Sequence, residues 1–426
     1  MSQFPPSGFI PTESAVSGIE LYKPTPQEMP HQPDVLDFKC PQCQATTAYS
    51  ISDGGLKCTH CGYYEPPSQP IVGKGAEEFE FTVETVETAI YAHGWGEARK
   101  ELQCQSCGAR TTLPEGHLTH TCPFCASNRV LQQDAPQDSL RPRFLIPFQV
   151  EPDECATLAR AWLGSSWMTP KALQNVAQVA RFSSIYVPFW TFDAFTEANW
   201  KAEVGHQETR RYRSGGEWKT HTVTVWRWES GHVKKAFDDQ LIPGTARLSN
   251  VLMARIKNYD TGQLVAYDPK FLAGFMAQAY DIQLPTAWEI GRREMREQTK
   301  LECRRQASTS RIRNFSMTLD FSNESWRYVL LPLYLSAYKY EDNTYQVMIN
   351  GQTGQTAGQR PVDWPKVWLA IAAMVAPGVI LGLLGLPTLI LGPLGVLLIG
   401  LAAFALIIGL IFAGVTYRKA KEMGDV

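Results

Sequence analysis

The longest apolar stretch of the chain lies near its C-terminus, where residues 367–417 include no charged side chain. A bilayer core about 30 Å thick is crossed by roughly 20 helical residues, so this block is long enough for two spans. The segments 367–386 and 394–417 fit these spans, and the prolines within residues 387–393 favour a turn between them. The pattern therefore predicts a transmembrane helical hairpin over residues 366–417.

The charges that flank the apolar block predict its orientation. Lys366 precedes the block and a basic tail at residues 418–426 follows it, whereas the connecting turn is uncharged. Basic residues favour the cytoplasmic side of a membrane, so both termini are expected there. The protein is then a two-span protein of the cytoplasmic (inner) membrane. A re-entrant hairpin is the alternative, because the turn itself is apolar.

Residues 141–362 alternate between strand and helix patterns. Apolar and polar side chains alternate over residues 190–204, which indicates a half-buried strand. A charged helix is expected at about 285–306, and residues 328–340 and 345–350 are expected to form a hairpin. This order of elements favours an α+β cytoplasmic domain with largely antiparallel strands.

Four finer expectations concern the same region. Residues 220–228 and 233–237 are expected to pair through a turn at residues 229–232. Asp153 is expected to cap a helix whose apolar face includes Cys155. Cys303, in the charged helix, is expected to be half exposed. A second helix is expected to open at Thr169-Pro170.

The N-terminal third is organised by cysteine pairs. Residues 1–35 have no continuous apolar segment and are expected to form a disordered tail without a signal peptide. Eight of the ten cysteines then fall in four C-x-x-C pairs. In each of two repeats, 14 residues separate the second cysteine of one pair from the first of the next. The eight residues are Cys40, Cys43, Cys58, Cys61, Cys104, Cys107, Cys122 and Cys125.

This spacing predicts zinc ribbon 1 at residues 36–66 and zinc ribbon 2 at residues 100–132, with a linker containing a short helix at residues 67–99. Zinc prefers four tetrahedral ligands and favours thiolates, so we expect two structural Zn²⁺ ions. Paired cysteines of this kind indicate a reducing compartment. A redox dithiol and an iron–sulfur cluster are the competing interpretations. A closed four-sulfur site leaves no position for substrate, so catalysis there is not expected.

These patterns together predict a multidomain protein. It combines two small β zinc ribbons, the α+β domain and the two-helix transmembrane hairpin. The whole chain of 426 residues has a formal net charge of −2, which argues against a surface adapted throughout to nucleic acid. Ribbon surfaces bind nucleic acid in some proteins and other proteins in others, and they also serve only to staple small domains.

One local patch mixes basic and aromatic residues. Such a mixture binds single-stranded nucleic acid through phosphates and base stacking, or anionic lipid headgroups. The same pattern is expected of a twisted hairpin with one aromatic face and one solvated face. The residues are Arg210, Arg211, Arg213, Trp218, Lys219, Trp226, Arg227 and Trp228.

No catalytic signature is present in the sequence. The chain has no G-x-x-x-x-G-K-[ST] phosphate loop, no G-x-S-x-G elbow and no H-E-x-x-H motif. We therefore expect a protein that is not an enzyme.

Several short motifs, in a shared order, resemble one bacterial group. The chain is similar to the YdjG-type membrane proteins, described as having TFIIB-type zinc ribbons and often labelled primosomal protein N′ or superfamily II helicase-like. The resemblance implies a cytoplasmic domain on a membrane anchor that works with membrane-organising proteins of PspA or SPFH type. The chain lacks helicase motor motifs, so no helicase activity is inferred. The motifs are CQSCGA at 104–109, CPFC at 122–125, YVPFW at 186–190, FLAG at 271–274, LPLYL at 331–335 and NGQTG at 350–354.

The expected function is that of a membrane-anchored adaptor or scaffold. It would recruit partner proteins to the cytoplasmic face of the bilayer, in membrane-organisation or stress assemblies. The alternative is a membrane-tethered, replication-associated protein whose ribbons bind nucleic acid. The partner's identity and any homo-oligomer stay open at this stage.

Overall fold

The computed structural model describes residues 9–12, 21–24, 38–66, 71–81, 100–106, 108–112, 122, 124, 127, 129–134, 140, 142–171, 173, 182–340, 343–388 and 393–424. The chain forms two compact units, residues 1–36 and residues 37–426. In the first unit, β1 (Phe9–Thr12) pairs antiparallel with β2 (Leu21–Pro24). The segment expected to be a disordered tail thus contains a short strand pair.

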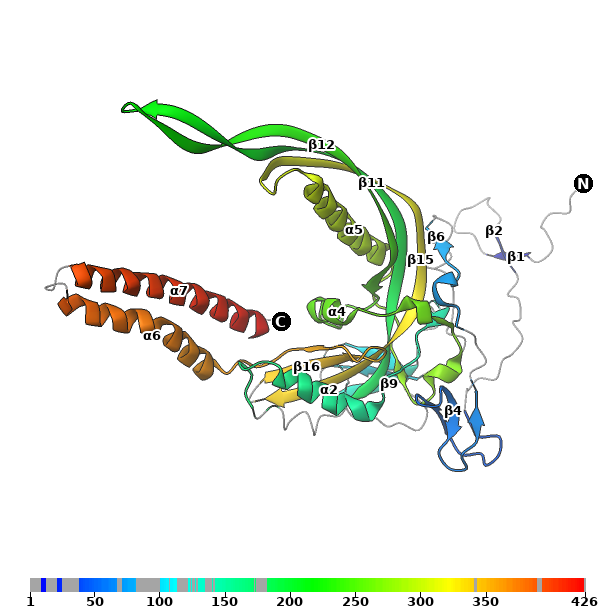
Figure 1. The fold of residues 1–426 in the computed structure, drawn as a ribbon. Coiled ribbons are helices and arrows are strands. Elements are labelled where there is room, and N and C mark those ends of the chain that lie inside the picture. Colours follow the sequence, from blue (N-terminus) through cyan, green and yellow to red (C-terminus); the bar gives the residue numbers. More distant parts are fainter. Residues whose placement is uncertain are drawn as a thin grey trace, which may run out of the picture. The chain divides into compact units, whose positions relative to one another are not determined.

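Three long antiparallel strands dominate the second unit (Figure 1). β11 (Ser183–Ser214) lies between β12 (Glu217–Pro243) and β15 (Ile312–Tyr340). β15 continues into a hairpin with β16 (Asn343–Asn350), which also pairs with β17 (Thr356–Gly358). The largely antiparallel character expected of residues 141–362 is confirmed.

Short strands complete this sheet. β10 (Phe144–Leu145) pairs with β15 and with β13 (Val265–Ala266). β14 (Met276–Ala277) runs parallel to β11, and β6 (Phe79–Glu80) pairs with β15. Short helices connect these strands, among them α4 (Asn250–Ile256), η1 (Gly73–Gly75) and η2 (Thr261–Gln263).

The predicted alternation along β11 is what builds the core. Trp190 and Phe192 are fully buried on one face of the sheet, where Phe192 lies 5.2 Å from Trp288, ring centre to ring centre. Trp288 belongs to α5 (Leu284–Gln306), which packs along the long strands (Figure 1). Cys303 of α5 is fully buried and packs with Trp200, so the expectation that it is half exposed is wrong. The charged residues around Cys303 suggested an exposed position, but α5 turns the side that carries Cys303 toward the sheet.

The turn between β11 and β12 differs from the expected one. It lies at Gly215 and Gly216, whose φ values of 62° and 87° suit a two-residue hairpin turn. β12 passes through residues 229–232 without interruption, so the turn expected there is wrong. Gly231 is a glycine of close approach, because a Cβ there would lie 2.7 Å from Nε1 of Trp200.

The start of one helix also differs from expectation. α2 spans Pro152–Gly164, with Pro152 at its first position and Glu151 as the N-cap residue, so Asp153 is not the cap. Cys155 is buried in the core, as its position on the apolar face predicts. The motif at 271–274 lies on a short 3-10 helix, η3 (Pro269–Leu272). The linker helix expected within residues 67–99, and most of the helix expected after Pro170, lie outside the described residues.

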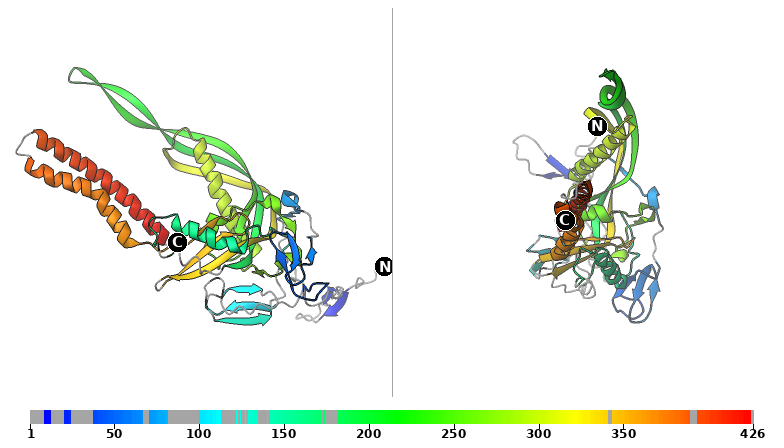
Figure 2. Two further views of the ribbon diagram at one scale, coloured as in Figure 1. Left: turned by 60° about the horizontal axis from the view of Figure 1, so that its bottom comes forward. Right: turned by 60° about the vertical axis from the view of Figure 1, so that its left-hand side comes forward.

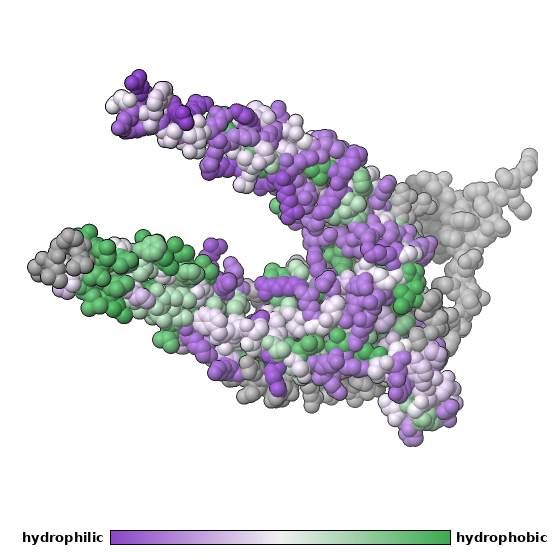
Figure 3. Space-filling view, viewed as in Figure 1, coloured by the Kyte–Doolittle hydropathy of each residue, from purple (hydrophilic) through white to green (hydrophobic). Residues whose placement is uncertain are grey.

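The apolar C-terminal block forms two helices, α6 (Trp364–Thr388) and α7 (Pro393–Gly424). By length and composition both could cross a membrane, and only 11% and 17% of their most apolar windows are buried. A core helix of a soluble protein would be mostly buried, whereas Figure 3 shows apolar surface over this pair. Pro387 lies within α6 rather than in the turn.

Candidate metal centre and its surroundings

The first two cysteine pairs meet at one point. Sγ of Cys40 lies 3.4 Å from Sγ of Cys61, and Sγ of Cys43 lies 3.5 Å from Sγ of Cys58. All four sulfurs lie within 4.8 Å of one another. They are held by a three-stranded sheet of β3 (Thr47–Ser50), β4 (Gly55–Cys58) and β5 (Tyr64–Glu65). The four cysteines can therefore hold a metal ion.

The backbone turns that carry these sulfurs are equivalent. The amide of Cys40 donates to the carbonyl of Ala45 at 2.7 Å, and the amide of Cys58 donates to that of Tyr63 at 2.8 Å. The residue after each pair has a positive φ, 62° at Gln44 and 77° at Gly62. The positive φ of Gly62 is expected, because glycine adopts this conformation readily. The positive φ of Gln44 could not be predicted, because glutamine rarely adopts it.

The thiols of the first cluster differ in acidity. For Cys43, burial and hydrogen bonds with the other three cysteines outweigh a backbone hydrogen bond from Ala45 and raise the pKa to about 12. A backbone hydrogen bond from Cys61 lowers the pKa of Cys58 to about 6. Thiolate is the metal-binding form of cysteine, so Cys58 offers a ligand at neutral pH. Cys40 and Cys58 are buried, whereas Cys61 is exposed, so one edge of the cluster faces outward.

The second pair of cysteine motifs repeats this backbone pattern. The amide of Cys104 donates to the carbonyl of Ala109 at 2.9 Å, and the amide of Cys122 donates to that of Ser127 at 2.7 Å. Both cysteines are buried, and Oγ of Ser127 lies 2.7 Å from Oγ of Ser106. Cys107 and Cys125 lie outside the described residues.

Short strands support the second region. β7 (Lys100–Cys104) pairs with β8 (Arg110–Thr112) and with β9 (Val130–Asp134), seen as cyan strands in Figure 2. Through Thr112, β8 joins the edge of the large sheet at Ala277 of β14.

One face of the first cysteine region is used inside the chain. The ring of Tyr49 lies 5.2 Å from that of Phe271, and the Tyr49 amide donates to the carbonyl of Ala273 at 3.1 Å. Lys270 forms an ion pair with Glu65 at 2.5 Å. This face packs on the α+β domain, whereas Cys61 at the cysteine-bearing edge is exposed.

The basic and aromatic patch is divided by the structure. Beyond Val204, β11 pairs with β12 alone, and the two strands form a free ribbon. At its end Arg213 lies opposite Trp218, which is 71% exposed, and Arg211 lies on the same face. Among the described residues no ion pair engages Arg211 or Arg213. Tyr212 packs edge-on to His221 on the other face.

The remaining members of this patch are engaged nearer the sheet. Arg227 and Arg210 both pair with Glu208. The guanidinium of Arg313 lies 4.1 Å from the ring centre of Trp226, and the ammonium of Lys201 lies 4.7 Å from that of Trp228. Lys219 is exposed opposite Tyr212. A hairpin with a solvated end thus accounts for much of the pattern.

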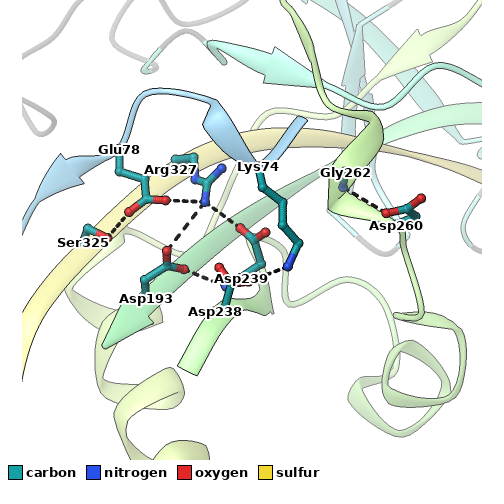
Figure 4. A network of polar contacts seen from close by, with 9 residues as sticks. All are labelled: Lys74, Glu78, Asp193, Asp238, Asp239, Asp260, Gly262, Ser325 and Arg327. Atoms are coloured by element: carbon teal, nitrogen blue, oxygen red, sulfur yellow. Dashed lines mark hydrogen bonds and ion pairs between the residues drawn. The ribbon is translucent and has the colours of Figure 1, made fainter. Parts of the chain in front are cut away.

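A buried arginine centre is the feature that sequence reasoning missed (Figure 4). The side chain of Arg327 is 1% exposed, and its Nη2 lies 2.6 Å from Glu78 and 2.8 Å from Asp239. Asp193 accepts a hydrogen bond of 2.6 Å from the Asp239 amide. Burial, reinforced by Glu78 and Asp239, raises the pKa of Asp193 to about 7.

This centre is structural in character. Oxygens of Asp193, Asp238 and Asp239 lie within 4.8 Å of one another, an arrangement that also suits a cation. Two side-chain cations already serve them, since Arg327 contacts Asp239 and Lys74 pairs with Asp238 at 2.5 Å. One local feature of the backbone marks this centre. Asp239 has a φ of 54°, and β11 and β12 shift in register beside it.

One grouping has the residue types of a hydrolase but not the geometry. Nε2 of His206 lies 2.9 Å from Glu229 and 3.4 Å from Oγ of Ser308. In a catalytic triad the acid and the nucleophile contact opposite ring nitrogens, whereas here both contact the same one. The group therefore cannot relay a proton from serine to carboxylate through the ring.

A four-cysteine cluster, antiparallel sheets and two exposed apolar helices define a multidomain protein with a candidate metal centre and a candidate membrane anchor. The comparisons agree with the resemblance drawn from its motifs. The chain is 24% identical over 338 residues to YdjG of Bacillus subtilis (strain 168), described as an uncharacterized protein. The match covers 78% of this chain and 92% of that protein, and it supports a YdjG-like protein. No protein-family model and no solved structure matches.

Proposed function

We propose that this protein is a membrane-anchored zinc-ribbon adaptor that recruits partner proteins to the cytoplasmic face of the membrane. The observation that carries the proposal is the exposed, apolar helix pair on a chain that also holds a four-cysteine cluster. No Asp, Glu, Lys, Arg or His lies within residues 367–417, which disfavours an ion or proton path. The hairpin then acts as an anchor for the remainder of the chain.

Each cysteine region holds one structural zinc ion in this proposal. Four thiolates match the preferred ligand set of zinc, and they leave no open coordination position. The repeated hydrogen bonds at Cys40, Cys58, Cys104 and Cys122 support equal roles for both regions. The zinc ions would stabilise domains too small to be held by an apolar core.

The outward edge of the first ribbon is the proposed contact surface. His60 and Cys61 are exposed there, whereas Tyr49, on the packed face, contacts the α+β domain. The resemblance to YdjG-type proteins suggests membrane-organising partners of PspA or SPFH type. An exposed edge that is held rigid by a metal ion would present a preformed surface to such a partner.

Partner capture tests the adaptor role. The solubilised full-length protein is expected to retain a partner after cross-linking in cells, and His60→Glu is expected to reduce the yield while zinc content stays unchanged. Glu289→Lys, on the exposed side of α5, is the matched surface control. Failure to recover any partner with wild-type zinc bound would argue against the adaptor role.

Nucleic-acid binding is the second candidate, because Trp218, Arg211 and Arg213 share one exposed face of the free ribbon. It predicts single-strand binding that weakens steeply with salt and is lost in Arg211→Gln/Trp218→Ala. Trp226→Ala should matter less, because Trp226 already lies under Arg313. Binding that is absent, or insensitive to salt, would dispose of this candidate.

A further inference from the structure

A pocket of about 530 Å³ lies at the base of the helix pair. One wall is a face of α6, formed by Lys366, Leu369, Ala370 and Ala373. Their spacing of three and four residues places them on the same side of the helix. The wall therefore runs from a charged residue at the start of α6 into the apolar part of the helix.

The loop after α2 forms the opposite wall, with Trp167, Thr169 and Lys171. This loop is held against both helices. Met168 is buried with Val367 of α6 and Ala420 of α7, and its carbonyl accepts a hydrogen bond of 2.8 Å from the Asp363 amide. The pocket is thus a defined feature of the junction between the α+β domain and the helix pair.

Two polar groups of the pocket, the hydroxyl of Thr169 and the ammonium of Lys171, lack partners among the described residues. Thr169 is 5% exposed, yet its hydroxyl has no hydrogen-bond partner among the residues that the structure describes. Burying a hydroxyl without a partner is costly, so such a group indicates a missing ligand atom or water. Lys366 pairs with Asp363 at 2.5 Å, whereas no ion pair engages Lys171 among the described residues. Lys171 therefore supplies a positive charge that no described residue balances.

We propose that this pocket binds an anionic phospholipid. Its phosphate would contact the ammonium groups of Lys171 and Lys366 and accept a hydrogen bond from Thr169, and an acyl chain would follow Leu369 and Ala373 along α6. The inference rests on the proposed membrane anchoring, which places the start of α6 at the headgroup level. Trp167, 51% exposed beside the pocket, suits the same interface.

The combination of charge and apolar wall selects this class of ligand. A zwitterionic lipid has no net charge to balance Lys171. A free phosphate ion would leave the apolar wall of α6 without a partner. An anionic phospholipid satisfies both parts of the pocket.

Lipid titration of the full-length protein tests the site. The protein is purified in non-ionic detergent, delipidated and titrated with phosphatidylglycerol or phosphatidylcholine of the same acyl chains, and bound lipids are counted by native mass spectrometry. One phosphatidylglycerol is expected to bind ahead of all others. Lys171→Gln is expected to weaken its binding about tenfold, because a charge-assisted contact to phosphate is lost. Thr169→Val is expected to weaken it less.

Lys300→Gln, on α5, is the matched control and should bind lipid as the wild type does. Equal affinity for the two lipids, or no effect of Lys171→Gln in a variant that keeps its zinc and helix content, would overturn the proposal. Displacement of the lipid by millimolar inorganic phosphate would instead assign the site to a free anion. Carbonate washing of membranes separates the two proposals: release of the protein refutes anchoring, whereas retention without lipid preference refutes only the lipid site.

Discussion

At the scale of single residues, the cysteines carry most of the chemistry that can be tested. Sγ atoms of Cys40, Cys43, Cys58 and Cys61 converge, and the pKa of Cys58 is lowered to about 6. The ligand types were evident from spacing alone. The convergence also needs the left-handed turns after each pair, one of which is made by Gln44.

Removing one sulfur should remove one metal ion. The wild type is expected to hold two zinc ions per chain and Cys58→Ser one, because three remaining thiolates bind zinc much more weakly. Elemental analysis of purified protein measures this ratio. Cys303→Ser, which changes a buried thiol outside the cluster, should leave the zinc content unchanged. A wild-type ratio of one would refute the second zinc site.

The raised pKa of Asp193 predicts a specific pH dependence of the protein's stability. Its pKa rises from 3.8 to about 7 on folding, so the folded state holds a proton that the unfolded state has lost between these values. The contribution of Asp193 to stability therefore falls as pH rises through this window. Compared with wild type, Asp193→Asn should gain thermal stability steadily from about pH 4 to pH 7 and then level off.

Thermal unfolding of both proteins across that range gives the measurement. Asp320→Asn on the exposed side of β15 serves as control, and its curve should run parallel to that of the wild type. A parallel curve for Asp193→Asn as well would show that Asp193 has no raised pKa in the folded protein.

At the scale of elements, the helix pair is held by two glycine contacts. A Cβ on Gly378 would lie 2.6 Å from the Leu406 amide nitrogen, and one on Gly409 would meet the carbonyl oxygen of Met374. Gly378 and Gly382 have the four-residue spacing that allows close helix packing. Gly378 makes such a contact within the hairpin, whereas a Cβ on Gly382 would lie 3.9 Å from Ala402. Gly409 lies in a row of small residues at four-residue spacing, Ala405, Gly409 and Ala413, a pattern that also favours close helix packing.

Filling the glycine contact should loosen the hairpin. Gly378→Leu is expected to destabilise the packed pair by about 1–3 kcal/mol, the usual cost of overpacking. Loss of helix signal on heating the protein in detergent measures this effect. Gly400→Leu is the matched control, since nothing lies within 4 Å of a Cβ there. Equal melting of the two variants would mean that the helices do not pack through Gly378.

The long hairpin shows how much element boundaries depend on context. Gly215-Gly216 and Gly231 are both glycine signals within one polar, aromatic stretch. Only the first makes a turn, because Trp200 on the neighbouring strand occupies the space beside Gly231. The strand pattern was therefore readable from the sequence, whereas the choice between the two glycine positions required the neighbouring strand.

At the scale of the whole molecule, the flanking charges predict a topology. Lys366 lies at the start of α6, and Arg418, Lys419 and Lys421 lie near the end of α7. Positive charges on both outer ends favour a hairpin whose turn faces away from the cytoplasm. The re-entrant alternative predicts that the turn does not reach the far side.

Cysteine labelling in intact cells separates these alternatives. With a membrane-impermeant thiol reagent, Thr388→Cys is expected to react from outside, whereas Asp425→Cys should react only after the membrane is opened. Thr388 ends α6 and Asp425 lies in the tail, so the pair reports on both sides of the bilayer. Lack of outside labelling at residue 388, with normal expression, would favour the re-entrant hairpin.

The sequence alone determined the features that rest on local pattern. These features are the cysteine spacing, the uncharged block at 367–417 and the alternation along β11. Each is visible locally, because it matches the geometry or length of a single turn, helix or strand. Only the tertiary structure decided which distant residues meet. Arg327 contacts Glu78, which lies 249 residues away in the sequence. Thr169, in the loop after α2, lines one pocket together with residues of the distant helix α6. Such contacts depend on how whole elements pack. Periodicity shows which face of an element is buried, but it does not show which distant residue that face will meet.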